Sequence, residues 1–362
     1  MPKVSVIVPS YNHGPYITET IESVLSQDFE DFELVIVDDG SKDDTVEKIL
    51  KFKDPRLKFF GFKENRGACT AANKCILESS GEYIAMLSSD DVFLPGKLAK
   101  QTEFLDKNPG IGAVFGKASF VGESGAPVET RNPFKYENRG RHEWLRHFFY
   151  RGNCLCHPSA MIRRDCYNRV GFYDERFASL PDLDFWVRLC MHYEIYILDE
   201  PLINFRIRDN GANASGASLK GFLRLPVEYI QVCRHYLAIK DTDDFLKIFP
   251  EATKFGVVEK GLIPYFIARL AIEANNYCQN YFALNTLYDF LSTASEETKR
   301  KCGFEYKDLI SLAGKLDCFN LVESGRIKKQ FKKYGNPKHK NVSTVISNYF
   351  KKILTGNRFP ES

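Results

Sequence analysis

Two adjacent carboxylates, Asp90 and Asp91, follow a short apolar run and are the first candidates for chemistry in this sequence. The apolar residues 83–87 are strand-like, and two serines separate them from the acids. In an open α/β sheet, ligands bind beyond the carboxyl ends of the strands. Clustered oxygen atoms there suit a hard divalent ion that also binds substrate phosphates. The alternative is that the two acids cap a helix beginning near Pro95, because acids favour helix N-termini.

The elements that must position these acids alternate between strand-like and helix-like patterns. Apolar, β-branched runs predict buried strands, and amphipathic spacing predicts helices between them. The predicted strands are residues 4–8, 32–37, 56–60 and 83–87, and the predicted helices are residues 17–25 and 68–78. This alternation predicts an α/β domain with a mostly parallel sheet. Right-handed crossovers place the loops after such strands along one edge, so Tyr11, Asp39 and Asp90/Asp91 should converge in one nucleotide-sized cleft.

The middle of the chain continues the pattern less regularly. Residues 111–121 and 195–198 are strand-like, and residues 153–162 read as an apolar strand interrupted by His157-Pro158-Ser159. A helix over residues 180–189 is expected to start with Asp182 and Asp184 and to bury Phe185 and Trp186.

Two common phosphate-binding motifs are absent from the sequence. The turn after the first strand, PSYNHG, lacks the glycine spacing of a dinucleotide-binding fold. No GxxxxGK[ST] phosphate loop occurs either. The cleft is therefore not expected to be a Rossmann or P-loop site.

The composition is that of an ordinary globular protein. The chain has 362 residues, 44% of them hydrophobic and 27% charged, and a net charge of +3. No signal peptide or membrane-spanning run is recognised, so we expect a cytoplasmic protein. The ten cysteines are scattered without zinc-site spacing, which favours reduced thiols.

The C-terminal third has a different character. Helix-like apolar spacing dominates residues 216–320, and residues 326–358 contain many lysines and no acids. This basic amphipathic tail either rests on an anionic membrane surface or packs its apolar face on the body of the protein. Nucleic-acid binding is not expected, because no reader module accompanies the charge. We expect a catalytic domain over residues 1–215, a helical extension over 216–320 and a basic tail over 321–362.

Six motifs occur in an order that resembles the family-2 glycosyltransferases of GT-A fold. They are SVIVPSYN, LVIVDDGSKDDT, NRGACTAANK, YIAMLSSDDVFLPGKL, GFYDERF and LPDLDFWVRL. The resemblance covers about residues 2–215, and residues 1–40 are similar to a spore-coat polysaccharide glycosyltransferase of this family. An ordered series is more specific than any one motif.

The resemblance implies roles for individual residues. Pro9 and Tyr11 would line the pocket for the nucleotide base, with the Tyr11 ring stacked on it. Asp39 would accept a hydrogen bond from the base N–H, which favours UDP or TDP donors. Asp90 and Asp91 would contact the ribose and a bound Mg²⁺ or Mn²⁺, and Asp182 would be the general base. The alternatives are helix capping for Asp182 and turn formation for Asp39.

The sequence also departs from the family pattern. Ser88 stands where the family commonly has an Asp, and Ala72 replaces a usual Arg. Arg208 occupies the place of a frequent His near the diphosphate. Arg206 or Arg208 would then be a possible phosphate contact, since guanidinium groups pair well with phosphate oxygens.

Taken together, the resemblance implies an inverting, metal-dependent hexosyltransferase. It would move a sugar from a nucleotide diphosphate donor, expected to be a UDP-sugar, to a glycan or lipid-linked acceptor in bacterial surface polysaccharide synthesis. Its location would be the cytoplasm, with peripheral contact at the inner face of the membrane. One rival is a sugar-nucleotide pyrophosphorylase. Such an enzyme would have a Gly-rich signature loop after the first strand, and the segment PSYNHG at that position is not such a loop. The other is a catalytically silent subunit that binds a glycan or a partner enzyme, which the serine at position 88 makes conceivable.

Overall fold

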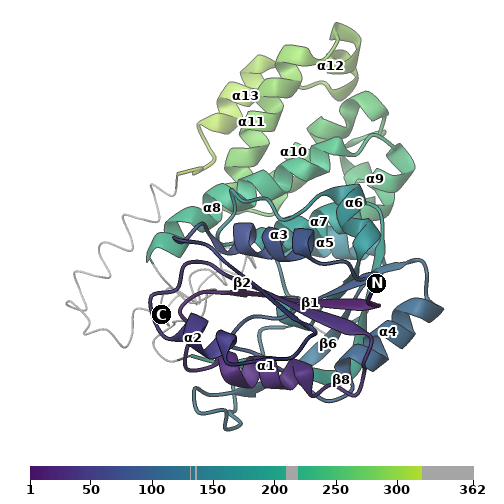
Figure 1. The fold of residues 1–362 in the computed structure, drawn as a ribbon. Helices are drawn as coiled ribbons and strands as arrows, with labels where there is room; N and C mark the ends of the chain where they lie inside the picture. Colours follow the sequence, from purple (N-terminus) through teal and green to yellow (C-terminus); the bar gives the residue numbers. More distant parts are fainter. Residues whose placement is uncertain (131, 135–136, 209–218, 320–362) are drawn as a thin grey trace. The chain divides into compact units, whose positions relative to one another are not determined.

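The computed structural model describes residues 1–130, 132–134, 137–208 and 219–319, which form two structural units (Figure 1). The first unit consists of residues 1–144 and 153–214, and the second takes residues 145–152 together with the chain from residue 215 onward. The contribution of residues 145–152 to the second unit was not anticipated from the sequence. The expected basic tail, 321–362, lies outside the described residues.

An eight-stranded sheet forms the centre of the first unit, in the order β3-β2-β1-β4-β7-β6-β8-β5. The runs predicted at residues 4–8, 32–37, 56–60 and 83–87 form four parallel neighbours; the apolar residues of the three inner strands are buried, and those of the edge strand at 57–61 are half-buried. These strands are β1 (Val4–Ser10), β2 (Phe32–Asp38), β3 (Leu57–Gly61) and β4 (Tyr83–Met86). Their carboxyl ends therefore lie at one edge of the sheet.

The other half of the sheet is mixed. Strand β6 (Ile111–Val121) runs parallel to β8 (Glu194–Arg206), whereas β7 (Met161–Arg163) is antiparallel to both β4 and β6. The short strand β5 (Val92–Phe93) is antiparallel to β8. The interruption predicted at His157-Pro158-Ser159 is confirmed as a 3₁₀ turn, and the part after it joins the sheet as β7, whereas the strand expected over residues 153–156 does not form. Proline removes a backbone donor at this turn, which explains the interruption.

Helices lie on both sides of the sheet, with α1 and α3 on opposite sides (Figure 1). Each connects two strands or follows a loop at the sheet edge, as in other parallel α/β folds. The helices of this unit are α1 (Ile17–Leu25), α2 (Thr45–Leu50), α3 (Ala68–Glu78), α4 (Lys97–Lys107), α6 (Arg164–Val170) and α7 (Pro181–Cys190). On α7, Phe185 and Trp186 are fully buried, as their spacing predicted.

The second unit is helical and includes the end of α5 (Arg141–Arg151). The Tyr229 hydroxyl and the Gln279 amide both donate to the carbonyl of Phe149, at 2.6 and 2.7 Å, and Tyr236 donates to the carbonyl of Leu145. These bonds satisfy carbonyls in the last turns of α5. The remaining helices are α8 (Leu219–Arg234), α9 (Thr242–Ile248), α10 (Ile263–Glu273), α11 (Tyr277–Thr293), α12 (Glu296–Cys302) and α13 (Tyr306–Ala313). Among the described helices, none combines the length and the apolar character needed to cross a membrane.

Candidate active site

The loops after β1 and β2 are tied to each other at the carboxyl edge of the sheet. Asn12 has a φ of 51°, a left-handed conformation that asparagine tolerates better than most residues. Its backbone N–H donates to the Ser41 hydroxyl at 2.8 Å, and its side-chain oxygen accepts from the backbone N–H of Lys42 at 2.8 Å. The two loops are therefore held in a fixed relation next to the turn that follows β4.

Helix α1 holds the turn that carries the two adjacent acids. The Thr20 hydroxyl lies 3.2 Å from the carbonyl of Ser89 and 2.8 Å from the carbonyl of Asp91. Helix α4 begins only at Lys97, with Gly96 before it, and no side chain caps it. The alternative that Asp90 and Asp91 cap this helix is therefore wrong, and another explanation is needed for the acid pair.

The two acids have different surroundings. Asp91 is 2% exposed, and one of its carboxylate oxygens accepts from the backbone N–H of Arg206 at 2.8 Å. Burial, followed by repulsion from Asp90, raises the pKa of Asp91 well above its usual range. The Asp90 carboxylate instead lies 3.8 Å from His13 Nε2 and 3.9 Å from a guanidinium nitrogen of Arg208. Asp90 is thus the member of the pair that faces the groups of the loops.

His13 is a site residue that the sequence reasoning missed. Its Nδ1 lies 2.7 Å from the Ser89 hydroxyl, and its Nε2 lies 2.9 Å from Arg208. A guanidinium N–H can only donate, so Nε2 accepts and the proton of the neutral ring belongs on Nδ1. Burial lowers the pKa of His13, which fits this neutral form. The only available signal was its position in the loop directly after the first strand.

Arg206 is placed as a structural residue of this edge. It is 1% exposed, and its guanidinium donates to the carbonyl of Asp90 at 2.8 Å and to that of Gly122 at 2.9 Å. It also forms an ion pair with Glu19 of α1. These contacts join β8, α1 and the acidic turn. Arg206 and Arg208 were both offered as possible phosphate contacts, and these bonds favour a structural role for Arg206. Arg208 is more exposed, at 20% of its side chain, and keeps that option.

The predicted base-binding residues lie at the same edge. Pro9 lies in β1 opposite Val37 of β2, and Tyr11, in the loop beyond, is 41% exposed. Asp39 is buried, and its two oxygens accept from the backbone N–H groups of Arg66 and Gly67 at 2.6 and 2.9 Å. It thereby fixes the start of α3. Turn formation was the alternative role for Asp39. That role belongs to Asp38, whose carboxylate accepts from the backbone N–H of Ser41.

Asp182 lies in the first turn of α7 and is partly exposed. One oxygen accepts from the backbone N–H of Leu183 at 2.7 Å, and the other accepts from the side-chain amide of Asn153. Burial raises the pKa of Asp182 to about 6, although both hydrogen bonds act in the opposite direction. Leu180 is the residue before the helix and makes no capping bond, so Asp182 is not its N-cap.

The segment between residues 156 and 173 connects Asp182 with the acidic turn. The Asp91 carboxylate is close enough to Cys156 to contribute to the raised pKa of that buried thiol, after burial itself. The next residue, His157, lies 2.8 Å through its Nε2 from the Tyr173 hydroxyl, and Asp182 is among the charges that raise the pKa of Tyr173. The hydrogen bond between His157 and Tyr173 thus links the segment beside the acidic turn to the segment that precedes α7.

The site offers carboxylate ligands to a divalent ion but no complete set of protein ligands within the described residues. Asp90 offers carboxylate oxygens, which Mg²⁺ and Mn²⁺ prefer. Within the described part of the chain, no group of three His, Cys, Asp or Glu side chains is placed to hold a metal. Mg²⁺ usually takes one or two protein carboxylates together with waters and substrate phosphates, and this donor set is compatible with that mode.

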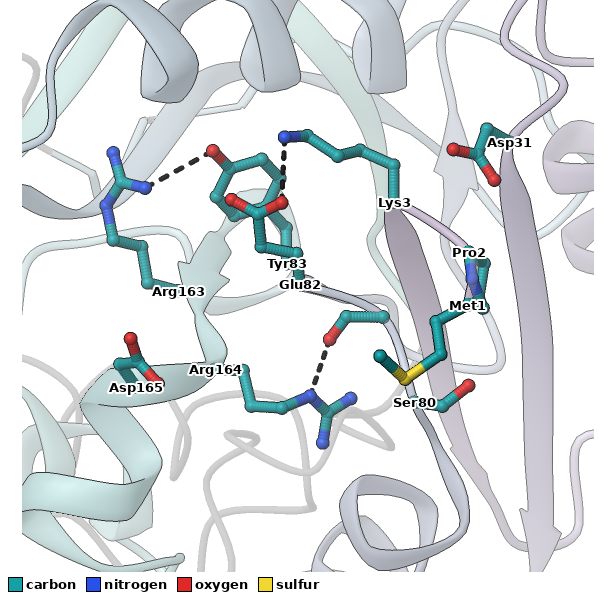
Figure 2. Close-up of a pocket in the computed structure, with 11 residues that line it drawn as sticks. Met1, Pro2, Lys3, Asp31, Ser80, Glu82, Tyr83, Arg163, Arg164 and Asp165 are labelled. Atoms are coloured by element: carbon teal, nitrogen blue, oxygen red, sulfur yellow. Dashed lines mark hydrogen bonds and ion pairs between the residues drawn. The ribbon is translucent and has the colours of Figure 1, made fainter.

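A hollow of about 470 Å³ lies elsewhere, at the amino ends of β1 and β4 (Figure 2). Its cationic side chains already have partners: Lys3 pairs with Glu82, and Arg163 donates to the Tyr83 hydroxyl at 3.2 Å. Arg164 is also engaged, because it donates to the carbonyl of Gly81. Ligands of parallel α/β sheets bind at the opposite edge, so this hollow is not the candidate site.

Comparison with known proteins identifies the class. Residues 5–171 match the model of Glycosyl transferase family 2. The chain is also 38% identical over 221 residues to the putative teichuronic acid biosynthesis glycosyltransferase TuaG of Bacillus subtilis, covering 59% of this chain and 82% of that protein. The chain therefore belongs to glycosyltransferase family 2, as the ordered motifs predicted.

Solved structures share the fold. A crystal structure of S. aureus TarS residues 1–349 in complex with UDP-GlcNAc has a TM-score of 0.56 at 21% identity, over 90% of this chain and 92% of that one. The mannosyltransferase PcManGT of Pyrobaculum calidifontis, in complex with GDP-Man and Mn²⁺, has a TM-score of 0.51 at 18% identity, over 99% and 88% of the two chains. The predicted GT-A fold with a helical C-terminal part is thus confirmed.

Proposed function

We propose that this glycosyltransferase is an inverting enzyme that moves a hexose from a UDP-sugar to a glycan or lipid-linked glycan in surface polysaccharide synthesis. The similarity to TuaG, a putative teichuronic acid biosynthesis glycosyltransferase, supports a polysaccharide product. The UDP-GlcNAc in the TarS complex supports a uridine donor. The observation that carries the proposal is that the loops after β1, β2 and β4, which bear Tyr11, Asp39 and Asp90, are hydrogen-bonded to one another at the carboxyl edge of one sheet.

The nucleotide would bind over the loops after β1 and β2. The exposed ring of Tyr11 is available for stacking on a base, and Pro9 would form the floor beneath it. Asp39 already accepts two backbone N–H bonds, and each carboxylate oxygen has a further lone pair. Its fixed orientation suits it to accept the N–H of a uracil ring.

The diphosphate would lie beside Asp90 and Arg208, whose charged groups are 3.9 Å apart. A divalent ion held by Asp90, with Asp91 beside it, would stabilise the negative charge that rises on the departing UDP. Arg208 would pair with a phosphate oxygen, taking over charge stabilisation that the missing acid at Ser88 weakens. His13 keeps Arg208 aimed at this place, because its neutral Nε2 accepts a guanidinium N–H.

Asp182 would remove the proton from the acceptor hydroxyl as its oxygen attacks the anomeric carbon. The new glycosidic bond forms while the bond to UDP breaks, which inverts the anomeric centre in one displacement. A pKa of about 6 suits a general base near neutral pH, since it is ionised but still basic enough to take the proton. Asn153 and the backbone of Leu183 hold the carboxylate in place during this transfer.

The test is UDP release from a panel of UDP-sugars, with and without Mn²⁺, by the full chain. Asp182→Asn is expected to bind UDP as the parent does but to lose transfer to an acceptor by at least about a hundredfold. Asp165→Asn is the matched control, because Asp165 also lies in the first turn of a helix, α6, but is not part of the candidate site. Unchanged turnover in Asp182→Asn would remove this residue from the mechanism. Absence of UDP binding and release across the panel would favour the silent binding subunit instead.

A further inference from the structure

Helix α8 presents an apolar stripe to the solvent. Leu219, Leu223 and Val227 are 70%, 63% and 60% exposed, and they follow one another at intervals of four residues. Side chains at this spacing lie on one face of a helix. The opposite face is buried in the second unit through Tyr229 and Val232. Helix α8 therefore packs against the described core of this unit through its other face, and the stripe is not part of that packing.

The charges around the stripe are positive. Lys220 and Arg224 are exposed and are the immediate neighbours of Leu219 and Leu223. The only acid within α8 is Glu228, which is 6% exposed and lies on the buried side. An apolar stripe flanked by basic residues is the pattern of helices that lie in the interface of an anionic membrane.

The described chain ends near the C-terminal end of α8. Phe319 is 71% exposed and packs edge-on against Tyr281 of α11, with 5.7 Å between the ring centroids. Tyr281 also lines a hollow together with Ile230 and Arg234, at the C-terminal end of α8. The sequence that follows Phe319 contains, over residues 326–358, ten lysines and arginines and no acid. In the sequence, this basic stretch therefore follows a residue that lies near the C-terminal end of α8.

We propose that the exposed face of α8, which we define as Leu219, Lys220, Leu223, Arg224 and Val227, docks on an anionic lipid membrane. The apolar side chains would enter the boundary between headgroups and acyl chains, and the two cations would contact anionic headgroups. The basic tail would add attraction to the same leaflet. This surface belongs to the helical unit alone, so the proposal stands or falls separately from the sugar-transfer function.

Vesicle flotation of the full chain tests the proposal, with phosphatidylcholine vesicles that contain or lack phosphatidylglycerol. The double variant Leu223→Asn/Val227→Asn is expected to bind anionic vesicles at least about tenfold more weakly. Lys220→Gln/Arg224→Gln is expected to lose roughly twenty-fivefold, since each basic residue near the surface contributes about fivefold. Val257→Asn is the matched control, because Val257 is 79% exposed in the same unit and outside the face; its binding should equal that of the parent.

Four results would overturn the proposal. The first is equal binding of the parent and both double variants, which would assign any membrane contact to the tail alone. The second is equal binding to vesicles with and without phosphatidylglycerol. The third is a fall of several degrees in the melting temperature of Leu223→Asn/Val227→Asn, which would mean that the chain itself covers the stripe. The fourth is a parent dimer in light scattering that this variant converts to a monomer, which would make a second copy the partner.

Discussion

At the scale of single residues, the environment of Asp182 sets the pH dependence of transfer. Burial raises the pKa of Asp182 to about 6. A general base is active only when ionised, so the rate should be half-maximal near pH 6, fall about tenfold per unit below it and level off above it. A kcat–pH profile with saturating donor and acceptor checks this. A profile that stays flat down to pH 5 would contradict the assignment.

Asn153 provides a second prediction at this scale. Its amide donates to Asp182, and a donor to a carboxylate stabilises the charged form and lowers the pKa. Asn153→Ala is therefore expected to move the acidic limb of the rate profile to higher pH and to lower kcat, while the donor KM stays unchanged. Asn153→Ser, which retains a hydroxyl donor, is the conservative comparison. A lower kcat without any displacement of the limb would indicate a merely structural role for Asn153.

The sequence made some of these residues predictable and others not. Asp90 and Asp39 follow apolar strands, and such positions converge whenever the strands are parallel. His13 and Asn153 carry no such signal, because each acquires its role from a partner 76 or 29 residues away in the chain. The alternatives offered for the acids were also local ones, whereas Asp39 in fact fixes the start of α3 through residues 27 and 28 positions further on.

At the scale of elements, β8 joins the acidic turn to the rest of the sheet through its last residue, Arg206. Replacing this buried guanidinium with Met would leave the carbonyls of Asp90 and Gly122 without these donors. We expect Arg206→Met to lower the free energy of unfolding by roughly 2–4 kcal/mol. Urea denaturation of the full chain provides the measurement.

The partly exposed Arg208 is the matched comparison for Arg206. Arg208→Gln is expected to change the free energy of unfolding by less than about 1 kcal/mol, because the Arg208 guanidinium lies 3.9 Å from the Asp90 carboxylate, too far for a hydrogen bond. Its donor KM should instead rise severalfold, as a phosphate partner is lost. If Arg208→Gln destabilised the protein as strongly as Arg206→Met, the division of roles between the two arginines would be wrong.

The mixed half of the sheet shows where element prediction failed. The four parallel strands were expected because continuous apolar runs are typical of doubly covered strands. Strand β8 was expected over only residues 195–198, but it extends from Glu194 to Arg206. The polar residues in the middle of β8 do not show a strand pattern. Pairing with β6 includes register shifts in this part of the strand. Tertiary pairing, which no local pattern encodes, completes this element.

At the scale of the whole molecule, the two units share the chain in an interleaved way. The carbonyls of Leu145 and Phe149 accept hydrogen bonds from Tyr236, Tyr229 and Gln279, which all follow residue 215. A fragment of residues 1–214 would therefore retain the apolar end of α5 without its partners. We expect this fragment to aggregate or to elute as large species in size-exclusion chromatography, whereas the full chain does not. A monomeric, cooperatively melting fragment would contradict this expectation.

The same interleaving constrains how proteins of this kind exchange parts. A helical appendage that used only the chain terminus would be acquired by simple fusion, and it would be replaced just as easily. Here the appendage also requires the stretch from Leu145 to Gly152, which lies far upstream. In a recombinant of two relatives, two separate segments of the chain must therefore match each other. A functional hybrid must take this internal stretch and the C-terminal helices from the same parent.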